Sequence, residues 1–291
     1  MFENSVDASA SDAIISLLNY VAIPRWKGGK MHSKDYLQSL FGCHGRKAVI
    51  TGASSGLGAT MARVLATAGA DILVVARRTE RLKELAAELQ ECEGSVYIHT
   101  ADLSNSADID SVAEQTCDQL GGCDIVVANA GTADRVRLES MAEEDFAMVM
   151  DLNLKAQWML AKALFPQLSK STAGRIINIA SIYGLGASVV NGLGAYTISK
   201  HGLVGLTRSQ AVEWARHGIT ANAIAPSFFP TEMTETALED ETMSTRLRTF
   251  TPQGRFGRPE EIATALLFLA SQASSYVNGT VVPVDGGWTA W

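Results

Sequence analysis

The stretch Lys47-Ala-Val-Ile-Thr-Gly-Ala-Ser-Ser-Gly-Leu-Gly58 decides the fold of this chain, because it joins a short apolar run to a glycine-rich turn. The run over 47–51 predicts a buried strand, and a helix is expected to begin near Ala59. Glycines let the backbone turn sharply and approach a pyrophosphate, while the helix N-terminus supplies amide donors and a positive dipole end. The spacing is G-x-x-x-G-x-G rather than G-x-G-x-x-G. Because the turn lies between a first strand and a first helix, it predicts nucleotide binding.

The same alternation of strand and helix continues from residue 46 toward the C-terminus. Short β-branched runs alternate with segments of helical periodicity, which is typical of βαβ units and a parallel sheet. We therefore predict an α/β fold, a doubly wound parallel sheet of seven strands with helices on both faces. The strands are expected over 47–51, 72–76, 95–99, 124–128, 175–180, 220–224 and 281–284. Helices are expected over 81–90, 143–168, 195–216 and 260–270.

Composition limits the classes of partner. The chain has 291 residues, of which 47% are hydrophobic and 19% charged, enough for one large core. A net charge of -7 without a long basic run gives no attraction to nucleic acid or anionic lipid. No stretch approaches the roughly 20 apolar residues of a membrane span. The four cysteines lack C-x-x-C spacing and no histidine pair has metal-ligand spacing, so we expect reduced thiols, a cytoplasmic compartment and no metal site.

Residues 1–45 precede the strand–helix series and read as an N-terminal extension. The apolar run over 13–23 predicts one short amphipathic helix, and the acidic residues before it argue against a secretory signal. The extension could pack on the domain or on a neighbouring subunit, or it could be a frayed terminus. We therefore expect one catalytic domain over 46–291.

The end of the second strand indicates which dinucleotide fits. An acidic residue there would bind the ribose 2'-hydroxyl of NAD, but this chain has Arg77 and Arg78. Because guanidinium binds phosphate through paired N–H groups, the two arginines favour the 2'-phosphate of NADP(H). Alternatively, they only solvate the start of the next helix. Asp102, at the end of the third strand, is placed either for the adenine edge or as a helix N-cap.

Tyr196 and Lys200 are the candidate acid–base pair. Both lie in the helical segment 195–216 at i and i+4, so their side chains share one face. A nearby ammonium favours the phenolate, and we expect it to lower the pKa of the tyrosine from about 10 toward neutrality. A phenol tuned in this way could exchange a proton with an alcohol or carbonyl. On its own the pair would be better interpreted as two ordinary residues of a helix surface.

Taken together, these motifs resemble the classical short-chain dehydrogenase/reductase family over residues 46–291. The resemblance implies a single Rossmann-type domain, hydride transfer between a nicotinamide and a carbonyl or alcohol, and a homotetramer. In that family the tyrosine is the acid–base, the lysine tunes it and holds the ribose, the serine orients the substrate oxygen, and the asparagine supports a proton-relay water. The implied catalytic set is Asn153, Ser181, Tyr196 and Lys200.

The resemblance also implies a cofactor-binding set, in which Thr231 contacts the nicotinamide carboxamide. Ser227 departs from the family, which usually has glycine after the proline at this position. The set is Gly52, Ser54, Ser55, Gly56, Leu57, Gly58, Arg77, Arg78, Asp102, Leu103, Asn129, Ala130, Gly131, Tyr196, Lys200, Pro226 and Thr231.

Substrate choice falls to segments that the motifs leave free, chiefly the long irregular segment 226–259, which we interpret as a lid with an acidic helical patch over 235–241. Within the family, residues 229–234 and 276–288 look like those of gluconate 5-dehydrogenase and 2-deoxygluconate 3-dehydrogenase. This resemblance implies a small polar substrate, a keto-sugar acid. A 3-oxoacyl-thioester reductase is the alternative enzyme, and a non-catalytic nucleotide sensor is the alternative of another class.

Overall fold

The computed structural model describes residues 33–133 and 135–291. The chain divides into two units, Met1–Tyr36 and Leu37–Trp291. Helix α2 (Ser33–Phe41), which the sequence pattern did not predict, spans the boundary between them. The amphipathic helix expected over 13–23 lies outside the described residues.

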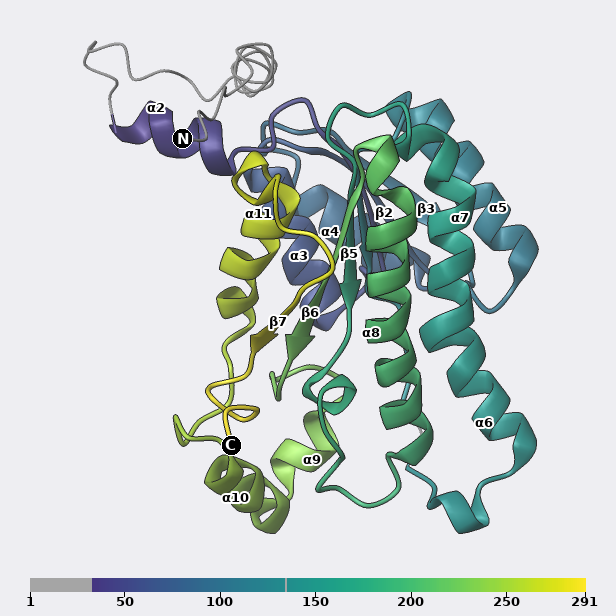
Figure 1. Cartoon of the computed structure of the whole chain (residues 1–291), viewed down its shortest axis with the longest axis vertical. Coiled ribbons are helices and arrows are strands. Elements are labelled where there is room, and N and C mark those ends of the chain that lie inside the picture. Colours follow the sequence, from purple (N-terminus) through teal and green to yellow (C-terminus); the bar gives the residue numbers. More distant parts are fainter. Residues whose placement is uncertain (1–32, 134) are drawn as a thin grey trace, which may run out of the picture. The chain divides into compact units, whose positions relative to one another are not determined.

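A parallel sheet of seven strands forms the centre of the larger unit (Figure 1). Its spatial order is β3-β2-β1-β4-β5-β6-β7, so the direction of winding reverses between β1 and β4. The α/β fold and all seven strands predicted from the sequence are confirmed. The bounds are β1 Lys47–Thr51, β2 Asp71–Ala76, β3 Val96–Thr100, β4 Ile125–Ala128, β5 Arg175–Ile179, β6 Thr220–Pro226 and β7 Val281–Val284. Strand β6 is longer than expected because its last residue, Pro226, still pairs with Val284.

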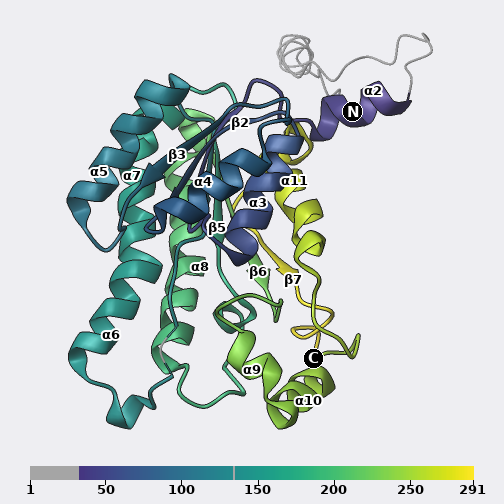
Figure 2. The same cartoon turned by 180° about the vertical axis from the view of Figure 1, so that it is seen from behind.

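Helices cover both faces of the sheet, α3, α4 and α11 on one and α5, α7 and α8 on the other (Figures 1 and 2). Successive side chains of a strand point to opposite faces. Ile50 of β1 accordingly shares a core cluster with Met61 and Leu65, whereas Val49 shares the other cluster with Leu160. The bounds are α3 Gly56–Thr67, α4 Thr79–Glu88, α5 Ser106–Gln115, α7 Ala156–Leu168, α8 Gly194–Trp214 and α11 Ala263–Ala270.

The helix expected over 143–168 is interrupted. It consists of α6 (Glu143–Met150), a π-helical turn (Asp151–Lys155) and α7. Such turns occur often at functional sites, and this one contains Asn153. Apolar periodicity predicted the helix correctly, but it carries no signal for one wider turn.

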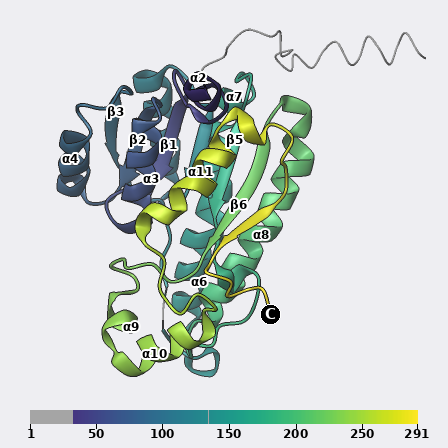
Figure 3. The same cartoon turned by 90° about the vertical axis from the view of Figure 1, so that its left-hand side faces the viewer.

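The segment 226–259 is more ordered than the expected lid. It contains two helices, α9 (Glu235–Glu239) and α10 (Glu241–Phe250), which lie beyond the carboxyl ends of the strands (Figures 1 and 3). Asp240 separates them, and its carboxylate accepts a hydrogen bond from the backbone N–H of Met243 at 2.9 Å. Because Asp240 is the N-cap of α10, the acidic patch expected over 235–241 is divided between two helices. In the described part of the chain, no helix is both long enough and apolar enough to span a membrane.

Candidate functional site

A cavity of about 440 Å³ lies at the carboxyl ends of β1, β2 and β4, where the strand order reverses. This is the position at which open α/β sheets bind ligands. Every residue predicted to bind the cofactor lines this cavity except Pro226, which lies in the β6 ladder instead. Six further residues line it that were not predicted to bind the cofactor, namely Val75, Ala76, Ala101, Leu152, Glu232 and Met233.

Glycine is required in the turn after β1 for steric reasons. Gly52 and Gly56 have φ of 66° and 53°, in the left-handed region that favours glycine. A Cβ on Gly58 would overlap the carbonyl oxygen of Gly52, so a larger residue could not close the turn. Helix α3 begins at Gly56 without a side-chain cap, which leaves its first N–H groups for an anion.

Asn129 ties the end of β4 to this turn. Its side-chain amide donates to the carbonyl oxygens of Thr51 at 2.9 Å and Gly52 at 3.3 Å. The Thr51 hydroxyl in return accepts from the backbone N–H groups of Asn129 and Ala130 at 3.0 and 3.1 Å. Asn129 therefore supports the wall of the cavity through its side chain.

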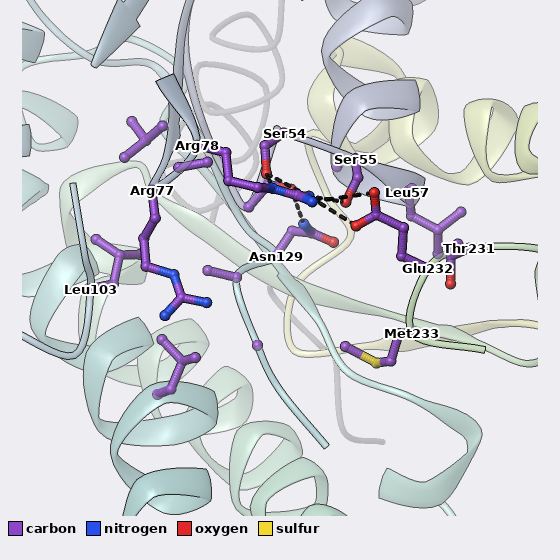
Figure 4. Close-up of a pocket in the computed structure, with 18 of the residues that line it drawn as sticks. Ser54, Ser55, Leu57, Arg77, Arg78, Leu103, Asn129, Thr231, Glu232 and Met233 are labelled. Atoms are coloured by element: carbon purple, nitrogen blue, oxygen red, sulfur yellow. Dashed lines mark hydrogen bonds and ion pairs between the residues drawn. The ribbon is translucent and has the colours of Figure 1, made fainter. Parts of the chain in front are cut away.

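The two arginines at the end of β2 have different partners (Figure 4). Arg78 crosses to the glycine-rich turn and donates to the Ser54 and Ser55 hydroxyls, with the closest distance 2.7 Å. Arg77 is more exposed and lies 3.7 Å from the carboxylate of Asp102. Arg78 thus does more than solvate the start of α4.

Asp102 is not a helix N-cap, so that alternative is wrong. Helix α5 is capped by Asn105, whose side-chain oxygen accepts from the N–H of Ala107 at 3.1 Å. The Asp102 carboxylate instead accepts from the backbone and hydroxyl of Ser104. These bonds, with the charge of Arg77, hold the pKa of the Asp102 carboxyl below its usual value.

Tyr196 and Lys200 both line the cavity from one face of α8. The Lys200 ammonium is buried, donates to the carbonyl oxygen of Ile179 at 2.7 Å and lies 5.5 Å from the centroid of the Tyr196 ring. The i and i+4 spacing therefore does bring the two groups together.

The expected lowering of the tyrosine pKa is wrong for this arrangement. Burial raises the pKa of Tyr196 to about 12, and the Ser181 hydroxyl offsets only part of the rise. Burial also lowers the pKa of Lys200 to about 8. The reason is that a low-dielectric site penalises both charged forms, and the Lys200 ammonium is directed at Ile179 rather than at the phenol oxygen.

Neither Ser181 nor Asn153 lines the cavity. Ser181 caps the short helix Ile182–Gly184, where its hydroxyl accepts from the N–H of Tyr183 at 3.1 Å. Asn153 is fully buried, donates to Thr132 O at 2.8 Å and accepts from Thr132 N at 2.8 Å. The Asn153 amide therefore holds the loop after β4.

Two further residues next to the pair were missed from the sequence. The buried Ser199 hydroxyl donates to Tyr196 O at 2.7 Å and accepts from the Asn153 amide at 3.0 Å, so it links the π-helical turn to the tyrosine. The Tyr183 ring meets the Tyr196 ring edge to face, with centroids 6.5 Å apart. The position of Ser199 beside Lys200 gave a weak signal, and nothing in the sequence distinguished Tyr183.

No group of three or more His, Cys, Asp or Glu side chains in the described ranges could hold a metal ion. All four cysteines are free.

Known proteins resemble this chain over most of its length. A family model described as enoyl-(acyl carrier protein) reductase matches residues 52–289. The 2-dehydro-3-deoxy-D-gluconate 5-dehydrogenase of Bacillus subtilis is 39% identical over 255 residues, which cover 87% of this chain and 98% of that protein. A 3-oxoacyl-[acyl-carrier-protein] reductase of Rickettsia bellii is 38% identical over 243 residues, covering 84% and 96%. Among solved structures, a gluconate 5-dehydrogenase of Burkholderia cenocepacia in complex with NADP and tartrate has a TM-score of 0.83 and 34% identity, covering 88% and 99%.

The buried ammonium of Lys200 predicts a particular dependence of stability on pH. Below pH 8 the folded and unfolded chains both hold this proton, and the folded state bears the cost of burial. Between pH 8 and 10.5 the folded protein has released a proton that the unfolded chain still binds, so stability rises with pH in this window. Relative to Lys200→Met, the free energy of unfolding of the wild type should increase by about 3 kcal/mol across it.

Chemical denaturation at a series of pH values measures this difference. Lys170→Met, which removes an exposed ammonium, is the control and should follow the wild type. A wild-type curve parallel to that of Lys200→Met from pH 7 to 10 would contradict the assignment.

Proposed function

Since this chain belongs to the short-chain dehydrogenase/reductase family and is therefore an oxidoreductase that acts on CH–OH groups with a nicotinamide cofactor, we propose which residues perform the reaction and on what class of substrate. The observation that carries the proposal is that Tyr196 and Lys200 line the same cavity as the glycine-rich turn and the two arginines. One cavity thus joins a phosphate-binding end to a proton-transfer end. Residues 46–291 would act as the catalytic domain and 1–45 as an extension.

The residues of the cavity fit a nicotinamide dinucleotide. The amides at the start of α3 suit the pyrophosphate. Among the described residues the Lys200 ammonium has Ile179 O as its acceptor, so further N–H donors are left for ribose hydroxyls. The cofactor, when bound, supplies or accepts the hydride. Arg77, Arg78 and the nearby serines support NADP(H) over NAD(H), as does the NADP complex of the related Burkholderia enzyme.

Tyr196 is the proposed proton donor to the substrate oxygen during carbonyl reduction. Its raised pKa keeps the phenol protonated at neutral pH, which is the form a general acid needs. Ser181, whose hydroxyl already interacts with the phenol, would orient the same substrate oxygen. Lys200 would hold the ribose and stabilise the phenolate after transfer. Asn153 would support the proton relay, and its amide holds the loop beside it.

We propose a keto-sugar acid as substrate, because relatives that share more than a third of the sequence act on gluconate derivatives. A 3-oxoacyl thioester is the second candidate. The observation in its favour is an aromatic cluster that packs with Tyr196, where Phe228 lies 6.1 Å from Tyr183 and 5.5 Å from Trp288 between ring centroids. Apolar surroundings suit an acyl chain better than unpaired sugar hydroxyls.

Removal of the Tyr196 hydroxyl tests the catalytic assignment. Tyr196→Phe should lower kcat by at least about a hundred-fold, since it removes the proposed proton donor, and should leave the Kd for NADPH nearly unchanged. Tyr276→Phe, which removes a fully exposed hydroxyl, is the matched control and should keep wild-type turnover. The assignment is wrong if Tyr196→Phe keeps more than about a tenth of kcat.

A substrate panel tests the reaction. NADPH oxidation, followed at ~340 nm, should occur with 5-ketogluconate or a related keto-sugar acid, because the Tyr196 phenol lines the cavity that would hold the cofactor. Turnover with acetoacetyl thioesters alone would favour the second candidate. Tight NADPH binding with no turnover across keto-sugar acids, thioesters and simple diketones would support the nucleotide sensor.

We also propose a cytoplasmic homotetramer. Reduced cysteines support the compartment, and exposed hydrophobic side chains on α6, α7 and α8 (Met148, Trp158 and Val212) and at the C-terminus (Trp291) support subunit interfaces. Multi-angle light scattering should therefore give about four times the 31.0 kDa chain mass. A monomer at micromolar concentration would contradict the proposal.

A further inference from the structure

A cluster of anion-binding groups lines part of the cavity, and the anion that it holds is a carboxylate side chain of the protein itself (Figure 4). Arg78 donates to Ser54 Oγ at 3.1 Å and to Ser55 Oγ at 2.7 Å. The same guanidinium lies 2.9 Å from one carboxylate oxygen of Glu232 and donates to the other at 3.2 Å. One arginine and two hydroxyls of a glycine-rich turn are the donors that a phosphate would take.

Glu232 reaches this cluster from the loop that follows β6, between Thr231 and Met233, which also line the cavity. Hydrogen bonds from Arg78 and Ser55 hold the pKa of the Glu232 carboxyl below its usual value, so it is charged at neutral pH. The other acidic residue of the cavity wall, Asp102, is engaged by Ser104 and Arg77. Glu232 is therefore the carboxylate that neutralises Arg78.

We propose that Glu232 occupies the position on Arg78 that the 2'-phosphate of NADP(H) would take, and that it must leave when NADP(H) binds. This inference rests on the proposed use of NADP(H). Glu232 then determines cofactor specificity, because it competes with the 2'-phosphate and has no equivalent effect on NAD(H), which lacks that group. The carboxylate weakens NADP(H) binding and so reduces the difference in affinity between NADP(H) and NAD(H).

The contacts permit such an exchange. Both partners are about half exposed, at 46% for Arg78 and 52% for Glu232, and exposed ion pairs are weak. A phosphate monoester carries nearly -2 at pH 7 and offers more acceptor oxygens, so it should displace a single carboxylate.

The loop itself need not move for Glu232 to leave. The Thr234 hydroxyl accepts from the backbone N–H of Thr231 at 3.0 Å and donates to the carbonyl oxygen of Phe229 at 2.5 Å. These bonds hold the turn independently of Arg78. A rotation of the Glu232 side chain is therefore enough to free the guanidinium while Thr231 stays in the cavity wall.

Binding measurements on Glu232→Gln test the proposal. Calorimetric titration with NADPH, with 2',5'-ADP and with NADH should show that the first two bind about five-fold more tightly to the variant than to the wild type, while NADH changes by less than about two-fold. Glu239→Gln, which removes an equal charge from an exposed position of α9, is the matched control and should bind all three as the wild type does.

Unchanged or weaker binding of 2',5'-ADP by Glu232→Gln would overturn the proposal, since it would show that Glu232 either stands clear of the phosphate or positions Arg78 for it. Arg78→Ala separates this failure from failure of the NADP(H) proposal. If Arg78→Ala weakens NADPH binding but Glu232→Gln does not strengthen it, only the proposed competition between Glu232 and the 2'-phosphate is wrong. If NADPH and NADH bind with equal affinity to the wild type and to Arg78→Ala, both the proposed use of NADP(H) and the proposed competition are wrong.

Discussion

Burial of the Lys200 ammonium at the end of β5 is the constraint on which the rest of the site depends. The cation is held by the carbonyl oxygen of Ile179, so helix α8 must stay in register with the sheet. That register fixes Tyr196, which lies one helical turn earlier. Ser199 and Asn153 extend the arrangement, because their hydrogen bonds join α8 to the π-helical turn and, through Thr132, to the loop after β4.

The opposite end of the cavity depends on backbone geometry. Because the winding of the sheet reverses between β1 and β4, the connections that leave their carboxyl ends go to opposite faces of the sheet and leave room for a ligand. Left-handed glycines close the turn above this opening, and Asn129 holds it against β4. Arg78 then supplies the positive charge at the rim, where Glu232 balances it. A rigid proton-transfer end and an exchangeable anion end thus share one cavity.

Sequence reasoning located most of this arrangement because its signals are local. The strand runs, the glycine spacing and the pair at i and i+4 each depend on neighbouring residues. It failed where tertiary contacts decide the outcome. The π-helical turn that contains Asn153 has no local sequence signal, and Asn105 rather than Asp102 is the N-cap of α5. Burial raises the pKa of Tyr196, whereas the sequence predicted that it would be lowered. The contact of Glu232 with Arg78 joins distant parts of the chain, so no local pattern could reveal it.

The protonation of Lys200 gives the most direct test of this account. Carbon-13 NMR of protein labelled at the lysine ε-carbon, with Lys200→Met to assign the signal, would follow its titration. Lys200 should titrate with a midpoint near pH 8, because burial penalises the cation. A midpoint at about pH 10.4, as for a lysine in water, would show that the ammonium is not buried as described and would contradict this description of the site.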